Sequence, residues 1–218
     1  MRKILFIVLG TWLSLTAIAQ NEWEIPNAQP QKPTPTKVEK QKPVEQKDNP
    51  DAPYLAGAVP EVDGIVTWNL HVDAPGKSAQ ELYDRMMEHF SKLTSGENQL
   101  EGSCVSLVNK QEHIIVVSLR EWMVFRSSLL SLDRTKFFCK IVATCKDGAV
   151  DVVFDRLTYR YEEERSEGGQ LYKAEEWISD RAALTKKGKM YRGCAKFRRK
   201  TVDRMNELMD GIRAAIEN

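Results

Sequence analysis

The sequence lacks the short motifs by which most hydrolytic, nucleotide-dependent and metal-dependent enzymes are identified. It contains no GxSxG, HExxH, GxxxxGK(S/T) or GxGxxG pattern. The sequence therefore gives no indication of a nucleophile elbow, a zinc-protease helix, a phosphate-binding loop or a dinucleotide-binding fold. A CxxC pair is also missing, which disfavours thiol redox catalysis. We therefore predict a protein that is not an enzyme, with no catalytic residues, no cofactor and no metal site.

Histidine is scarce, and only His71, His89 and His113 occur. The local patterns place these residues on a strand, in a helix and at a turn, so no two of them share a metal-binding spacing. A functional histidine also needs an orienting partner, which the sequence does not identify. We expect ordinary surface or boundary histidines.

An excess of charge of either sign is missing as well. The chain carries 32 Lys and Arg against 31 Asp and Glu, a formal net charge of +1. Such a balance does not attract the whole protein to nucleic acid or to an acidic membrane, and we expect no nucleic-acid partner. The hydrophobic content of 42% is typical of a soluble globular chain.

The N-terminal segment has the features of a secretory leader. Arg2 and Lys3 precede an apolar run over residues 4–18, and Ala17-Ile18-Ala19 has the small-x-small pattern of a signal peptidase site. The run is shorter than the about 20 apolar residues that cross a bilayer. We predict a signal peptide over residues 1–19, no transmembrane anchor after its cleavage, and export to the periplasm or cell envelope of a Gram-negative bacterium.

Residues 20–59 are rich in proline, lysine and glutamine and poor in large apolar side chains. Such a segment cannot bury enough surface to offset its ordering entropy. We predict a disordered linker over residues 20–59, followed by one folded domain over residues 60–218. The prolines of its central part are Pro26, Pro30, Pro33, Pro35, Pro43, Pro50 and Pro53.

The folded domain begins with a strand and a helix. Apolar residues alternate over 66–72, as in a half-buried strand. Ser78 and Glu81 form a capping box that opens a helix, which Ser95-Gly96 ends. We expect further strands over 104–108 and 114–125. The apolar face of the first helix is Leu82, Met86, Phe90 and Leu93, and that of a long final helix is Val202, Met205, Met209, Ile212 and Ile216.

A hairpin is predicted over residues 137–161, turning at Asp147-Gly148, a dipeptide typical of a type I′ turn. This turn pairs Lys146 with Ala149 and Cys145 with Val150. The register then predicts one core face, with Leu157 and Tyr159 on the opposite face. Strand, helix, antiparallel strands and helix together predict an α+β fold, a curved antiparallel sheet with two main helices packed on one face. The predicted core face is Cys139, Ile141, Ala143, Cys145, Val150, Val152 and Phe154.

In an oxidising compartment, Cys104, Cys139, Cys145 and Cys194 could form disulfides. Cys139 and Cys145 cannot pair with each other, because their positions in one strand put them about 20 Å apart while bridged Cα atoms lie within about 7 Å. The remaining options pair each of these two with Cys104 or Cys194. Alternatively, Cys139 and Cys145 are small buried residues on the apolar strand face.

An acidic segment over residues 161–180 precedes a basic segment that is interleaved with Tyr191 and Phe197. The basic segment could hold an anionic partner, or the two segments could face each other or water. The candidate patch is Lys186, Lys187, Lys189, Arg192, Lys196, Arg198, Arg199 and Lys200.

Several segments together resemble a known family. These are Glu81-Leu-Tyr-Asp-Arg85, the turn Cys145-Lys-Asp-Gly148 running into Asp155-Arg-Leu-Thr-Tyr159, and Ala174-Glu-Glu-Trp-Ile178 before a terminal amphipathic helix. Over residues 60–218 the sequence is similar to DUF4468, a family of exported bacterial domains of unknown function. The resemblance implies a fold like that of the TATA-box-binding protein and brings no catalytic residues. A fold similar to that of a DNA-binding protein is not evidence that this protein binds DNA.

These observations predict a non-enzymatic exported interaction module whose partner is an envelope protein or glycan. The alternative is a carrier of an apolar small molecule, because a helix can part from a sheet to leave an apolar cavity.

Overall fold

The computed structural model describes residues 49–128, 131–162 and 168–217. The predicted signal peptide and residues 20–48 of the predicted linker lie outside these residues. None of the described helices is long and apolar enough to cross a bilayer. In chain order the elements are η1 (Ala52–Tyr54), β1 (Glu61–Val62), β2 (Ile65–Val66), β3 (Trp68–Asp73), α1 (Ala79–Thr94), β4 (Cys104–Asn109), β5 (Ile114–Ser128), β6 (Ser131–Lys146), β7 (Ala149–Tyr161), β8 (Gln170–Lys173), α2 (Ala174–Trp177), α3 (Asp180–Ala183) and α4 (Ala195–Glu217).

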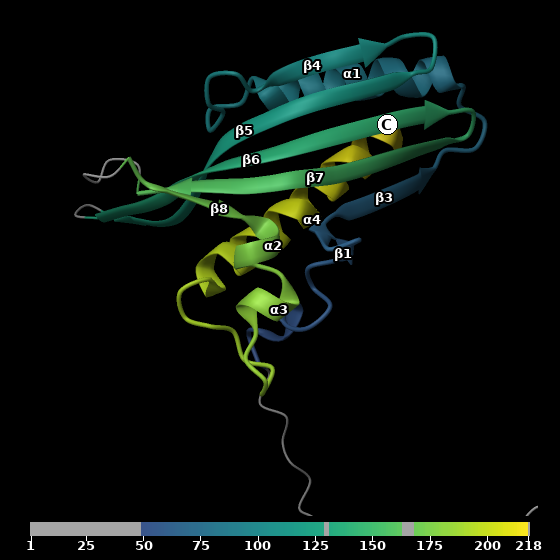
Figure 1. The fold of residues 1–218 in the computed structure, drawn as a ribbon. Helices are drawn as coiled ribbons and strands as arrows, with labels where there is room; N and C mark the ends of the chain where they lie inside the picture. The colour runs from purple at the N-terminus through teal and green to yellow at the C-terminus, as the bar shows by residue number, and fades with distance from the viewer. Residues whose placement is uncertain (1–48, 129–130, 163–167, 218) are drawn as a thin grey trace, which may run out of the picture. The chain divides into compact units, whose positions relative to one another are not determined.

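The main sheet is antiparallel and has the strand order β3-β7-β6-β5-β4, with β8 paired to β7. The sheet is curved, and the two long helices α1 and α4 lie on the same face of it (Figure 1). A separate two-stranded ribbon is formed by β1 and β2. This arrangement confirms the predicted α+β fold.

The core lies between the sheet and the two long helices. Alternate residues of the strands, such as Val117 and Ile141, are fully buried against Met86 and Phe90 of α1 and Ile212 of α4. Each such side chain contributes about 1.5–3 kcal/mol when it leaves water. The period of two in the strands and the apolar helix faces therefore explain why these elements stack in layers.

Helix α1 begins where the capping box predicted. The Ser78 hydroxyl accepts a hydrogen bond from the Glu81 backbone N–H at 3.2 Å. The hairpin turn also contributes, because the Asp147 carboxylate accepts from the Ala79 backbone N–H at 2.8 Å. The turn between β6 and β7 therefore holds the first turn of α1 in place.

The hairpin register is confirmed near its turn, where Lys146 pairs with Ala149 and Cys145 with Val150. Farther along, the prediction is wrong: Leu157 and Tyr159 are fully buried on the core face. Their strand contains a bulge, because the pairing shifts by one residue and Arg156 takes a positive φ of 54°. One extra residue exchanges the two faces of a strand.

The folded unit begins before residue 60. The Tyr54 hydroxyl donates to the Asp203 carboxylate of α4 at 2.8 Å, and Val59 is buried in the core. The predicted linker boundary therefore extends too far, and residues 51–59 belong to the domain. The entropy lost by ordering residues 51–59 is compensated by the burial of Val59 and by the hydrogen bonds from Arg198 of α4 to the backbone carbonyls of Tyr54 and Leu55.

Candidate functional site

The face of the main sheet opposite α1 and α4, called the outer face below, is not covered by any helix of the described residues (Figure 1). Across its centre, Val116, Val142 and Val153 are cross-strand partners on β5, β6 and β7. All three are partly exposed, and Leu107 on the edge strand β4 extends the row with 59% exposure. The sheet therefore presents an apolar row to its surroundings.

Beyond the next row, Ser118, Lys140 and Asp155, the outer face becomes basic toward β8. Cross-strand pairing aligns Arg120, Phe138, Thr158 and Lys173 in one row and Trp122, Lys136, Arg160 and Leu171 in the next, followed by Val124 and Arg134. We call these the basic rows. Their charged members are all cations. On the half of the face nearer the Asp147-Gly148 turn, Lys140 pairs with Asp155 and Lys146 with Asp151, so charge there is balanced.

Arg134 has a defined orientation within the basic rows. Its guanidinium carbon lies 3.6 Å from the centre of the Trp122 ring, and the Lys136 ammonium lies 5.7 Å from the same point. A cation over an indole is stabilised by about 0.5–1 kcal/mol at an exposed site. A stacked guanidinium keeps its N–H groups pointing outward in its plane, where they can bind a carboxylate or phosphate.

Three cations of the basic segment predicted as an anionic-partner patch are engaged within the domain. Arg198 is fully buried, Lys196 binds Asp133 at 2.8 Å and Arg199 binds Asp51 at 2.8 Å. These cations hold the fold together, and Arg198 cannot contribute to an exposed surface. The exposed members of the predicted patch are Lys186, Lys187, Lys189, Arg192 and Lys200.

The buried Arg198 guanidinium joins segments that are far apart in the sequence. It donates to the backbone carbonyls of Tyr54 at 2.5 Å, Leu55 at 2.7 Å and Ile178 at 2.5 Å. It also forms an ion pair with Asp180 at 2.6 Å. Arg198 therefore connects the start of the domain to α3 and α4.

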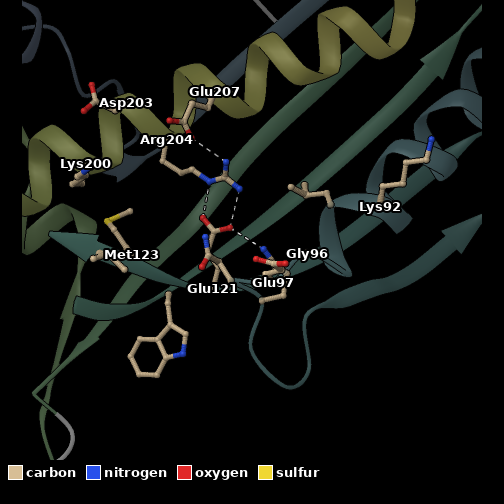
Figure 2. Close-up of a pocket in the computed structure, with 14 residues that line it drawn as sticks. Lys92, Gly96, Glu97, Glu121, Met123, Lys200, Asp203, Arg204 and Glu207 are labelled. Atoms are coloured by element: carbon tan, nitrogen blue, oxygen red, sulfur yellow. Dashed lines mark hydrogen bonds and ion pairs between the residues drawn. The ribbon is translucent and has the colours of Figure 1, made fainter. Parts of the chain in front are cut away.

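A cavity of about 710 Å³ lies between the end of α1, β5 and α4. In its wall, both oxygens of the Glu121 carboxylate accept from Arg204, at 2.7 and 2.9 Å, and Gln99 donates to one of them at 3.0 Å (Figure 2). Burial by itself would lower the pKa of Arg204, but Glu121 and Glu207 hold it above its usual value. Charged walls of this kind do not suit the apolar ligand of a carrier.

All four cysteine thiols are free in the structure. Cys139 and Cys145 are buried on the core face, as the alternative to a disulfide predicted. Burial raises the pKa of Cys145 to about 12, so its thiol stays protonated and unreactive. Cys194 is also buried, whereas Cys104 is exposed on β4.

The histidines lie apart, and no three His, Cys, Asp or Glu side chains of the described segments gather as metal ligands. His71 lies on the outer face, 2.6 Å from an Asp151 oxygen and 3.3 Å from an Asp73 oxygen. His113 packs edge-on to Tyr83. The hydrogen bonds with Asp151 and Asp73 raise the pKa of His71, whereas burial and the nearby Lys92 charge lower the pKa of His89.

An NMR titration should therefore separate the two histidines, with His71 titrating above 6.5 and His89 below it. Because the folded pKa of His71 is raised, its ion pairs stabilise the fold fully below pH 6.5, and this contribution is lost as the pH rises through the folded value. Asp151→Asn should lower the pKa of His71 and leave that of His89 unchanged. An unaltered His71 pKa in this variant would contradict the assignment.

The basic rows escape a linear search of the sequence, because each strand supplies only one or two of their cations. The sequence does contain one usable signal. Arg120 and Trp122 are two residues apart, as are Arg134 and Lys136, and this spacing places each pair on one face of a strand. Cross-strand pairing was needed to place these pairs side by side.

Comparison with known proteins agrees with this architecture. The fold defines an α+β domain of the TBP-like class: a TBP-like protein from Parabacteroides distasonis ATCC 8503 is similar to it, with a TM-score of 0.55 at 19% identity over 74% of this chain and 98% of that chain. A DUF4468 family protein from Bacteroides ovatus ATCC 8483 is 38% identical, with a TM-score of 0.71 over 78% of this chain and 96% of that one.

The family model described as a domain of unknown function (DUF4468) with TBP-like fold matches residues 68–160. The chain belongs to the DUF4468 family, as the sequence resemblance predicted. No curated protein matches it.

Proposed function

We propose that this DUF4468 protein is a non-enzymatic interaction module of the periplasm or cell envelope, which binds a macromolecular partner through its outer face. The observation that supports this function is the asymmetry of the main sheet. One face is covered by α1 and α4 (Figure 1), whereas the other presents partly exposed Val116, Val142 and Val153 beside the basic rows. A broad sheet face with an apolar row and charged neighbours has the composition of a recognition surface.

Export is supported by the leader sequence, in which Arg2 and Lys3 precede an apolar run and a small-x-small site at Ala17-Ile18-Ala19. The partner is an envelope protein or glycan.

Site-specific photo-crosslinking in intact cells tests this function. A photoreactive residue at Val142, which lies centrally on the outer face, should form a covalent adduct with the partner. The same residue at Asp210 on the exposed side of α4 is the control and should form none. Mass spectrometry of the adduct should find a mature N-terminus near Gln20.

Equal crosslinking at Val142 and Asp210 would contradict the outer face as the binding surface. Recovery of an intact Met1 on the abundant protein would contradict export.

A further inference from the structure

We infer that the basic rows are a binding site for an acidic polysaccharide, which they contact through its carboxylate, sulfate or phosphate groups. The inference rests on the proposed role of the outer face and specifies its partner. It depends chiefly on Arg120, Arg134 and Lys173, since Lys136 and Arg160 take part in further interactions of the chain.

The first argument is charge. Arg120 and Lys173 are exposed. They lie at the two ends of one cross-strand row, with Phe138 and Thr158 between them. Within the described segments, the Arg120 guanidinium has a weak contact of 3.4 Å with the Ser118 hydroxyl and no carboxylate partner. The ammonium of Lys173 lies 4.0 Å from a Glu176 oxygen, and an exposed pair of this kind contributes about 0–1 kcal/mol. These cations therefore remain available to an external anion.

The second argument is the preorganisation of Arg134. Its stacking on Trp122 at 3.6 Å fixes a planar group whose N–H donors match the two oxygens of a carboxylate or the oxygens of a phosphate. Side-chain ordering usually opposes binding, at a cost of about 0.5–1.5 kcal/mol for each flexible side chain. The cation–π contact removes part of this cost before the ligand arrives.

The third argument is the shape and composition of the surface. The basic rows extend over β5, β6, β7 and β8, and adjacent strands lie about 4.8 Å apart. A spread of cations over a sheet fits an extended polymer better than a small anion. Phe138 is partly exposed and Leu171 is 61% exposed, so each offers an apolar surface to the C–H faces of sugar rings.

A nucleic acid fits this surface less well. Single-stranded nucleic acids bind largely by stacking their bases on exposed aromatic rings. The Trp122 ring is already engaged by Arg134, which leaves Phe138 as the one aromatic ring of the basic rows on which a base could stack. The formal net charge of +1 provides little long-range attraction to a duplex. Export, as proposed above, also separates the protein from chromosomal DNA.

Titration calorimetry of the chain from residue 20 to residue 218 tests the inference. Polygalacturonate is the acidic probe, dextran the neutral one, and a DNA duplex of matched charge the nucleic-acid arm. Polygalacturonate should bind, dextran should not, and DNA should bind at least about tenfold more weakly, a difference of about 1.4 kcal/mol. The double variant Arg120→Gln and Lys173→Gln should lose about tenfold in affinity for polygalacturonate.

The matched control is Lys92→Gln with Arg213→Gln, which removes one lysine and one arginine charge from exposed positions on α1 and α4 and should change the affinity less than about twofold. Arg134→Lys keeps the charge and removes the planar fork, so it should bind severalfold more weakly. All variants alter exposed or partly exposed side chains and should unfold at the wild-type temperature.

Three results would overturn the inference: no binding of polygalacturonate, equal losses in the sheet variant and its control, or DNA binding as tight as that of polygalacturonate. Its failure can be told apart from failure of the proposed function. Crosslinking at Val142 without polysaccharide binding leaves the interaction module and removes this ligand. Polysaccharide binding without crosslinking in cells keeps this ligand and removes the proposed role of the outer face in intact cells.

Discussion

Arg198→Met is expected to lower the free energy of unfolding by about 3–5 kcal/mol, because it breaks the ion pair with Asp180 and leaves three backbone carbonyls without their charged donor. The carbonyls belong to Tyr54, Leu55 and Ile178. Methionine fills much of the volume of the arginine stem, so lost packing contributes little. Urea unfolding followed by circular dichroism measures the change.

Arg199→Met is a matched control on the next residue. Arg199 pairs with Asp51 while both side chains remain more than a third exposed, and such a pair contributes about 0–1 kcal/mol. Limited proteolysis gives a second readout, because Arg198→Met should make residues 51–59 cleavable under conditions that leave the wild type intact. Similar losses of stability in the two variants would show that the buried contacts are not what stabilises this region.

Arg204→Met should also destabilise the domain by about 3–5 kcal/mol, because it leaves the Glu121 carboxylate charged and buried without its partner. The Glu121 side chain is 5% exposed and bound through both oxygens. The double variant Arg204→Met with Glu121→Met should recover most of this loss, since it removes both charges together. Urea unfolding of the two single variants and the double variant gives the coupling energy.

Arg213→Met is the control for this cycle. It removes an ion pair with Asp210 on the same helix, in which the side chains are 44% and 73% exposed, and should cost no more than about 1 kcal/mol. A double variant as unstable as Arg204→Met would contradict the assignment, because the loss could not then come from an unpaired carboxylate.

Much of the fold could be predicted because its signals are local. The capping box at Ser78, the turn at Asp147-Gly148 and the alternation of β3 each depend on residues close together in the sequence. Local signals of this kind predict which elements form, and antiparallel strands joined by short turns leave few ways to arrange them.

The remaining features depend on contacts between distant residues. The bulge at Arg156 has no sequence signature, because the positive φ falls on a residue that rarely adopts it. The role of Arg198 depends on Tyr54 and Leu55, which lie well over a hundred residues away in the chain. Placing the basic rows required the register of four strands at once.

The bulge in β7 also constrains how this strand can vary. Before Arg156, residues with even numbers such as Val152 and Phe154 point into the core, and after it Leu157 and Tyr159 do. Loss of the Arg156 codon would remove the extra residue and place Leu157 directly after Asp155, so Leu157 and Tyr159 would still point into the core. The bulge is therefore the point inside β7 where the chain can lose a residue, whereas a loss elsewhere in the strand would exchange the two faces of part of it.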